Sequence, residues 1–216
     1  MQQQAISQQT LATNQVIRNT YLLLSMTLLT SAVTAGFAMM AGASYVNPFI
    51  MLIVFIGMPF VINYFRNSAW GLLLTFVFTG FMGYVLGPVL NYYLAMSNGS
   101  QIVASAMTTT AVVFFSLSAY ALTTRKNFSF MGGFLFAGLI VVLLAIVANL
   151  FLNIPALSLT ISSIAVMLMA GLILYDTSRM IHDPNANYIM MTVSIYANIY
   201  VMFVHLLNLF GFFNQE

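Results

Sequence analysis

One acidic residue stands inside an apolar stretch of this sequence, and its side chain is the best placed to do chemistry. Asp176 ends the run Leu172-Ile173-Leu174-Tyr175-Asp176. A carboxylate at the centre of a bilayer costs about 2.5–3.5 kcal/mol, and such residues commonly mark ion or proton sites. Arg179 follows three residues later, so an intrahelical ion pair explains Asp176 equally well. Both interpretations stay open at this point.

A second set of polar side chains lies near the end of the chain. Ser194, Asn198, His205 and Asn208 are separated by four, seven and three residues, which places them on one face of a helix. The stripe predicts either interhelical hydrogen bonds, worth about 0.6 kcal/mol each on average, or a polar pathway through Ser194, His205 and Asn208. His205 by itself is compatible with a packing residue or with a proton carrier.

Enzyme signatures are missing from the sequence. It has no cysteine, no His-Glu-x-x-His, no Gly-x-Ser-x-Gly and no phosphate-binding glycine loop. An intramembrane aspartyl protease needs two carboxylates in one site, and only Asp176 lies within an apolar stretch. His205 could act as a base, but no serine sits in a glycine turn of the required kind. We expect no enzymatic activity and no cofactor.

The composition defines the elements that must hold these residues. Of 216 residues, 62% are hydrophobic and 4% are charged, whereas soluble domains have about 25% charged residues. This excludes a soluble globular domain, and the high hydrophobicity excludes a disordered chain. A net charge of +2 spread along the chain makes no nucleic-acid surface. The chain is therefore expected to be an all-α integral membrane protein surrounded by lipid.

Seven apolar stretches are long enough to cross a bilayer, which takes about 20 residues. The first exceeds the apolar region of a cleaved signal peptide, so we expect it to be retained. Residues 1–19 form a polar cytoplasmic tail with six glutamines, residues 20–213 form a single seven-helix membrane domain, and residues 214–216 form the C-terminal end. The expected spans lie at about 20–43, 47–65, 70–93, 101–123, 129–151, 156–178 and 189–213.

The five basic residues predict the orientation of these spans. If all seven stretches cross the membrane, every basic residue falls on the same side, which the positive-inside rule makes cytoplasmic. The N-terminus is then cytoplasmic and the C-terminus is on the opposite side. The basic residues are Arg18, Arg66, Arg125, Lys126 and Arg179.

Glycine and proline in the third stretch predict close helix packing. Gly83 and Gly87 are spaced so that a neighbouring helix can approach closely. Pro88 and, in the second stretch, Pro59 each free a backbone carbonyl and favour a kink.

Three blocks of the sequence form a recognisable set. The longest is Tyr120-Ala121-Leu122-Thr123-Thr124-Arg125-Lys126-Asn127-Phe128-Ser129-Phe130-Met131-Gly132-Gly133, and the others are Gly83-Tyr84-Val85-Leu86-Gly87-Pro88 and Ile173-Leu174-Tyr175-Asp176-Thr177. Together they resemble the Bax inhibitor-1 family, also called the transmembrane BAX inhibitor motif proteins. The resemblance extends from about Arg18 to Phe213. It includes the opening Val16-Ile17-Arg18-Asn19-Thr20-Tyr21, which is similar to the bacterial YccA-type branch.

The resemblance implies seven transmembrane helices with the last helix central in the bundle. It also implies two functions. The YccA-type branch is a substrate and modulator of the membrane AAA protease FtsH and interacts with the regulators HflK and HflC. Other members are pH-sensitive calcium leaks. We expect an inner-membrane protein of the first kind, whose tail gives the protease a short disordered starting point. A calcium or cation leak, and a membrane scaffold without transport, remain the alternatives.

The resemblance also implies a set of gate residues. The leak gate of the family is a pair of aspartates on helices six and seven with a nearby arginine. Asp176 matches the first aspartate and would be a tentative calcium ligand, Asn198 stands in place of the second, and Arg66 lies at or beside the arginine position; Arg179 is the local basic partner. Asn127 likewise replaces an aspartate found in many relatives.

The replacement by Asn198 has a chemical consequence. Two neighbouring carboxylates share a proton and titrate together, whereas an amide donates directly to an ionised carboxylate. Our hypothesis is that a latch between Asp176 and Asn198 depends less on pH than a pair of aspartates. One carboxylate is also a poor site for Ca²⁺, which binds six to eight oxygens.

Overall fold

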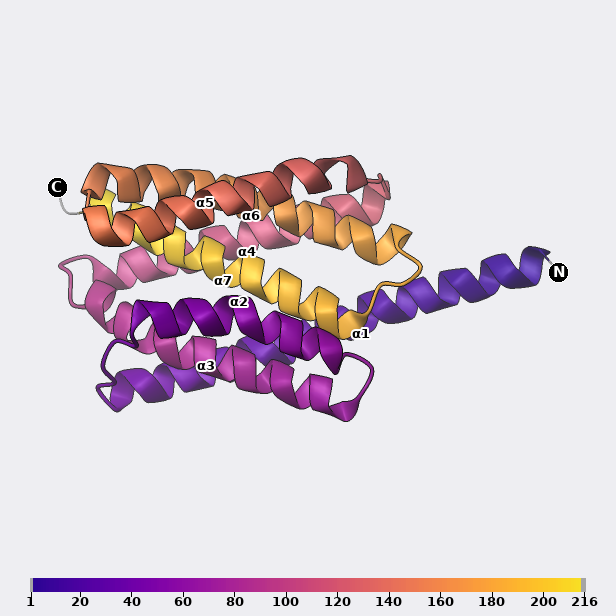
Figure 1. Cartoon of the computed structure of the whole chain (residues 1–216), viewed down its shortest axis with the longest axis horizontal. Helices are drawn as coiled ribbons and strands as arrows, with labels where there is room; N and C mark the ends of the chain where they lie inside the picture. The colour runs from indigo at the N-terminus through magenta and orange to yellow at the C-terminus, as the bar shows by residue number, and fades with distance from the viewer. Residues whose placement is uncertain (1, 215–216) are drawn as a thin grey trace. The chain divides into compact units, whose positions relative to one another are not determined.

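The computed structural model describes residues 2–214, with side chains at Leu11 and from Thr13 onward. All regular structure in these residues is helical, and Figure 1 labels the helices. They are α1 (Gln2–Met40), α2 (Pro48–Tyr64), α3 (Ala69–Leu94), α4 (Gly99–Thr124), the short 3-10 turn η1 (Ser129–Met131), α5 (Gly132–Leu152), α6 (Pro155–His182) and α7 (Tyr188–Phe213).

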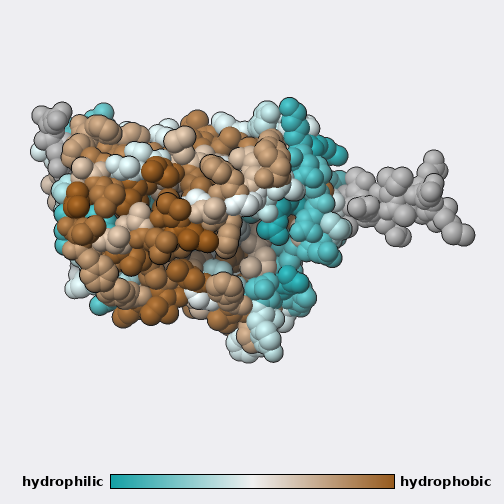
Figure 2. Space-filling model, turned by 45° about the horizontal axis from the view of Figure 1, so that its top comes forward, coloured by the Kyte–Doolittle hydropathy of each residue, from teal (hydrophilic) through white to brown (hydrophobic). Residues whose placement is uncertain are grey.

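The all-α membrane fold expected from the sequence is confirmed. Six of the described helices are long and apolar enough to cross a membrane, and α2 is an apolar helix of 17 residues. At about 1.5 Å per residue, α2 is close to the shortest length that spans about 30 Å of hydrocarbon. Figure 2 shows hydrophobic residues over much of the face it displays.

The first helix differs from the expectation of a disordered tail. α1 begins at Gln2 and runs without interruption into the apolar segment Thr13–Met40. The sequence explains this, since no glycine or proline occurs between Gln2 and Ala35, and adding residues to an existing helix needs no new nucleus. The polar N-terminal segment is therefore helical.

Asparagine side chains form several of the helix boundaries. The side-chain oxygen of Asn47 accepts a hydrogen bond from the Phe49 N–H at 2.9 Å, and Pro48 occupies the first helical position of α2. Asn187 does the same for α7, accepting from two backbone N–H groups at 3.0 and 3.3 Å. Asn153 ends α5 in the left-handed conformation, with φ of 49°.

The helices group into two compact units. The first contains residues 1–95 and 183–196, and the second contains residues 96–182 and 197–216. α7 contributes its first nine residues to the first unit and the rest to the second. Of the candidate spans, α7 has the largest buried share, 67%, as expected for a central helix. The single membrane domain over 20–213 stays a prediction.

Close backbone contact holds the first unit together. α1 packs on α3, which also packs on α2. Gly83 lies directly against the Ser31 carbonyl and the Thr34 hydroxyl, and a Cβ at Gly87 would be 2.5 Å from the Ala38 Cβ. The expectation that these glycines allow close helix packing is therefore confirmed.

Tyr196 connects α7 to the same helices of the first unit. Its hydroxyl donates to the Thr79 carbonyl at 3.2 Å and lies 2.8 Å from the Ser31 hydroxyl. Its ring meets Phe78 edge-on with centroids 6.0 Å apart. The Thr192 hydroxyl, one turn earlier, lies 3.2 Å from the Thr20 carbonyl and donates to it.

In the second unit, α6 packs against both α4 and α5. α5 and α6 interlock through two glycine–leucine contacts, because a Cβ at Gly138 would be 2.7 Å from Leu168 and one at Gly171 would be 2.8 Å from Leu135. The outward face of α5 exposes large apolar side chains, as a lipid-facing helix should. They are Phe134, Phe136, Val141, Leu144 and Phe151.

Candidate functional site

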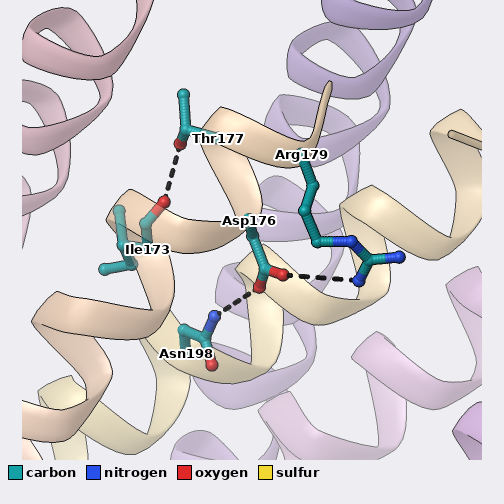
Figure 3. A network of polar contacts seen from close by, with 5 residues as sticks. All are labelled: Ile173, Asp176, Thr177, Arg179 and Asn198. Atoms are coloured by element: carbon teal, nitrogen blue, oxygen red, sulfur yellow. Dashed lines mark hydrogen bonds and ion pairs between the residues drawn. The ribbon is translucent and has the colours of Figure 1, made fainter. Parts of the chain in front are cut away.

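Asp176 on α6 and Asn198 on α7 are in direct contact within the second unit. The Asn198 amide nitrogen donates to one carboxylate oxygen of Asp176 at 2.9 Å (Figure 3). Both residues are buried, with 2% and 6% of their surface exposed. A hydrogen bond to an ionised acceptor is stronger than a neutral one, and this one needs no shared proton.

The other oxygen of Asp176 faces Arg179. Their nearest nitrogen and oxygen are 4.0 Å apart, and the arginine side chain is 37% exposed. The same guanidinium lies over the ring of Tyr175, 5.7 Å from its centroid. A pair at this distance with one partner in solvent contributes little. Asp176 therefore interacts with both Arg179 and Asn198. Its hydrogen bond to Asn198 is shorter than its ion pair with Arg179.

Neighbours of Asp176 attach α6 to other elements of the second unit. Gly132, at the start of α5, leaves room for Tyr175, since a Cβ there would be 2.9 Å from the tyrosine hydroxyl. The Thr177 hydroxyl lies 3.4 Å from that of Ser118 on α4 and donates to the Ile173 carbonyl at 2.8 Å (Figure 3). Consecutive residues around Asp176 thus face different helices, which fixes the position of its side chain.

Ser178 fastens the loop between α4 and η1 to α6. Its hydroxyl accepts from the Phe128 N–H at 3.0 Å and donates to the Lys126 carbonyl at 3.1 Å. The Asn127 side chain accepts from the Ser129 N–H, the first residue of η1, at 2.9 Å. Sequence reasoning did not single out Thr177 or Ser178; the only signal was their position in or beside a family block.

A second polar cluster joins α6 and α7 near the other end of α6. The Asn208 amide donates to the hydroxyls of Ser158 and Ser162 at 2.9 and 3.0 Å. The Ser162 hydroxyl is also 3.0 Å from Nδ1 of His205. His205 and Asn208 thus have polar partners, as a helix–helix contact requires. The two serines were not predicted, although their spacing of four places them on one face.

Apolar residues separate the two polar clusters. On α7, Met202 lies between Asn198 and His205 on the same face and is fully buried. On α6, Ala165, Met169 and Ile173 occupy the corresponding stretch, each no more than 5% exposed. The polar stripe predicted for α7 is therefore interrupted by a buried apolar layer in the second unit.

The remaining predicted residues, Ser194 and Arg66, belong to the first unit. Arg66 donates to the Asn63 side chain at 3.3 Å, and its carbonyl accepts from the Asn187 amide at 3.2 Å. The structure thus brings Asp176, Asn198 and Arg179 together in one group.

The donor set around Asp176 fits Ca²⁺ poorly. Asn198 directs N–H rather than oxygen at the carboxylate, and Ca²⁺ binds six to eight oxygens. In the described part of the chain, no three histidine, aspartate or glutamate residues converge on one point. The arrangement is suited to a helix–helix latch.

Comparison with known proteins identifies the family. The sequence model of "Inhibitor of apoptosis-promoting Bax1" matches residues 13–215. The Modulator of FtsH protease YccA of Escherichia coli is 45% identical over 206 residues, which cover 95% of this chain and 94% of the relative. An uncharacterized protein of Pseudomonas aeruginosa is 50% identical over 196 residues, 91% of this chain and 88% of the relative. The chain therefore belongs to the Bax inhibitor-1 family.

Proposed function

We propose that this protein is an inner-membrane substrate and modulator of an FtsH-type membrane AAA protease. The observation that carries the proposal is the match to the relative named Modulator of FtsH protease YccA, 45% identical over nearly the full length of both chains. A relative from another strain of that species, also 45% identical over 206 residues, is named Inner membrane protein YccA. A match over 95% of this chain and 94% of the relative leaves no large part of the relative without a counterpart.

The N-terminal segment of α1 is the proposed point of engagement. It precedes the apolar segment Thr13–Met40 and contains five of the six glutamines found in residues 1–19. Because this segment is helical, the protease must unwind it before it can pull on the chain. HflK and HflC are the further partners proposed by resemblance.

Turnover in cells that contain the protease tests this proposal. Deleting residues 2–15 should lengthen the half-life of the chain severalfold, whereas replacing them with a Gly-Ser segment of equal length should restore degradation. Co-purification of the protease, with and without HflK and HflC, measures binding separately. Unchanged turnover of the deleted chain, together with no recovery of the protease, would contradict the proposal.

The orientation forms part of the same proposal, since the protease must reach the tail from the cytoplasm. The five basic residues support a cytoplasmic N-terminus and a periplasmic C-terminus if α2 crosses the membrane. A reporter active only in the periplasm should give signal when fused after Phe213 and none when fused before Gln2. The reverse pattern would contradict the orientation.

A calcium or cation leak is the second candidate, favoured by the buried contact between Asp176 and Asn198. The apolar layer at Met202 means that such a path would be closed in this conformation. Calcium-dye flux into proteoliposomes tests it: Asp176→Ala should abolish flux, and Asn198→Asp should make flux steeply dependent on pH. If neither substitution nor pH alters flux, the scaffold alternative is supported; equal pH dependence in wild type and Asn198→Asp would contradict our latch hypothesis.

A further inference from the structure

Two basic side chains of the second unit have no partner among the residues that the structure describes. Arg125 and Lys126 directly follow α4 and are exposed. Neither side chain makes a hydrogen bond or ion pair to any residue that the structure describes. Arg179, by contrast, is held by Asp176 and Tyr175. The two cations are thus available to an anion from outside the chain.

The backbone around these two residues is held in place. Arg125 adopts the left-handed conformation, with φ of 49°, a position that glycine usually occupies at a helix end. The Lys126 carbonyl and the Phe128 N–H are both hydrogen-bonded to buried Ser178. A charged residue therefore occupies a place that favours glycine, in a loop with a defined conformation.

An aromatic surface continues from the same loop. The rings of Tyr120 and Phe128 are 6.2 Å apart, and those of Phe128 and Phe130 are 6.4 Å apart. Phe130 is 80% exposed and Tyr120 is 45% exposed. Because α4 ends as a candidate span at Thr124, this surface lies where hydrocarbon gives way to headgroups, the level that aromatic side chains prefer.

We propose that Arg125, Lys126 and this aromatic surface form a binding site for an anionic phospholipid. The planar guanidinium of Arg125 matches two phosphate oxygens, and Lys126 supplies a second positive charge. Phe130 and Tyr120 contact the glycerol and upper acyl chain of the same lipid. A free phosphate ion would use the cations alone and has no need of an exposed apolar surface beside them. The proposal is independent of the protease function.

Binding of labelled lipid to the purified full-length protein in a neutral detergent tests the proposal. Fluorescent phosphatidylglycerol should bind more tightly than phosphatidylcholine with the same acyl chains. A basic residue near anionic lipid contributes a factor of about five, so Arg125→Gln with Lys126→Gln should weaken phosphatidylglycerol binding about 30-fold. Phosphatidylcholine binding should not change, and 1 M salt should remove most of the headgroup preference.

A matched control neutralises the same number of charges elsewhere. Arg18→Gln with Arg66→Gln has the same net charge and should bind phosphatidylglycerol as the wild type does. Because Ser178 holds only backbone atoms of the loop, the Arg125 and Lys126 variants should keep the thermal unfolding temperature of the wild type. Phe130→Ala should weaken lipid binding but leave its salt dependence unchanged.

Three results would overturn the proposal. The first is equal affinity for the two lipids, and the second is an equal loss in the control pair. The third is displacement of the labelled lipid by millimolar inorganic phosphate, which would make the site a free-anion site.

Discussion

The two units of this protein differ in the contacts that join their principal helices. In the first, α1 and α3 approach until backbone and small side chains touch, with Gly83 against Ser31. In the second, α6 packs on α5 through glycine–leucine contacts, but it contacts α7 and the loop after α4 through polar side chains, from Ser158 to Ser178. Both solutions answer the same problem, because lipid is as apolar as leucine and burial alone does not drive membrane helices together.

The difference predicts how each unit responds to mutation. Where backbones touch, no side chain can move aside, so steric changes should have large effects. Where hydrogen bonds join the helices, each contributes about 0.6 kcal/mol on average. Removing one of them should therefore lower the free energy of unfolding only slightly. A change of charge is the exception, because Asp176 is 2% exposed and has little access to water.

Gly83→Leu should have the largest effect on stability, and it tests whether α1 and α3 depend on close backbone contact. The new side chain would meet the Ser31 backbone, so we expect a loss of about 3 kcal/mol in the free energy of unfolding, the upper end for overpacking. Gly36→Leu on α1 is the matched control, since nothing lies within 4 Å of its Cβ position. Thermal unfolding followed by circular dichroism measures both, and equal losses would contradict close packing at Gly83.

Asn198→Asp tests the electrostatic exception in the second unit. Two adjacent buried carboxylates share a proton, whereas in the unfolded chain both are already ionised at neutral pH. The folded variant then binds more protons than the unfolded one, so its stability falls as pH rises, by at most about 1.4 kcal/mol per pH unit.

The wild type serves as the reference in that experiment. Its Asp176–Asn198 pair shares no proton, so the difference in stability between variant and wild type should grow from pH 6 to pH 8. Subtracting the wild-type curve removes the titration of both histidines. Parallel curves would show that the two side chains do not interact when both are acidic.

Sequence reasoning recovered the parts of the molecule that depend on local pattern. Apolar length located the helices, and the glycine spacing around Gly83 indicated close packing. The resemblance paired Asp176 with Asn198, and these side chains are in contact. The first two signals are local patterns of residue type, and the third is a carboxylate that is costly in a membrane helix.

Other features could not be predicted because their residues are unremarkable in sequence. Ser158 and Ser162 are common residues in membrane helices, and nothing marks them as partners of Asn208 before α6 and α7 are placed together. Tyr196 looks like one more aromatic residue, yet its hydroxyl contacts both α1 and α3. The helical tail was missed because its glutamines suggested solvent, whereas the helix simply continues from the span that follows.

Ser162→Ala should have the smallest effect on stability, and it tests the contribution of the hydrogen bonds between α6 and α7. The substitution removes the hydroxyl shared by Asn208 and His205, so we expect the free energy of unfolding to fall by about 1 kcal/mol, about a third of the effect at Gly83. Ser163→Ala is the control, because that exposed hydroxyl bonds only to the carbonyl of Leu159 in its own helix. Its unfolding temperature should stay within error of the wild type. If Ser162→Ala lowered the free energy of unfolding as much as Gly83→Leu, the hydrogen bonds between α6 and α7 would be as important for stability as the backbone contact between α1 and α3.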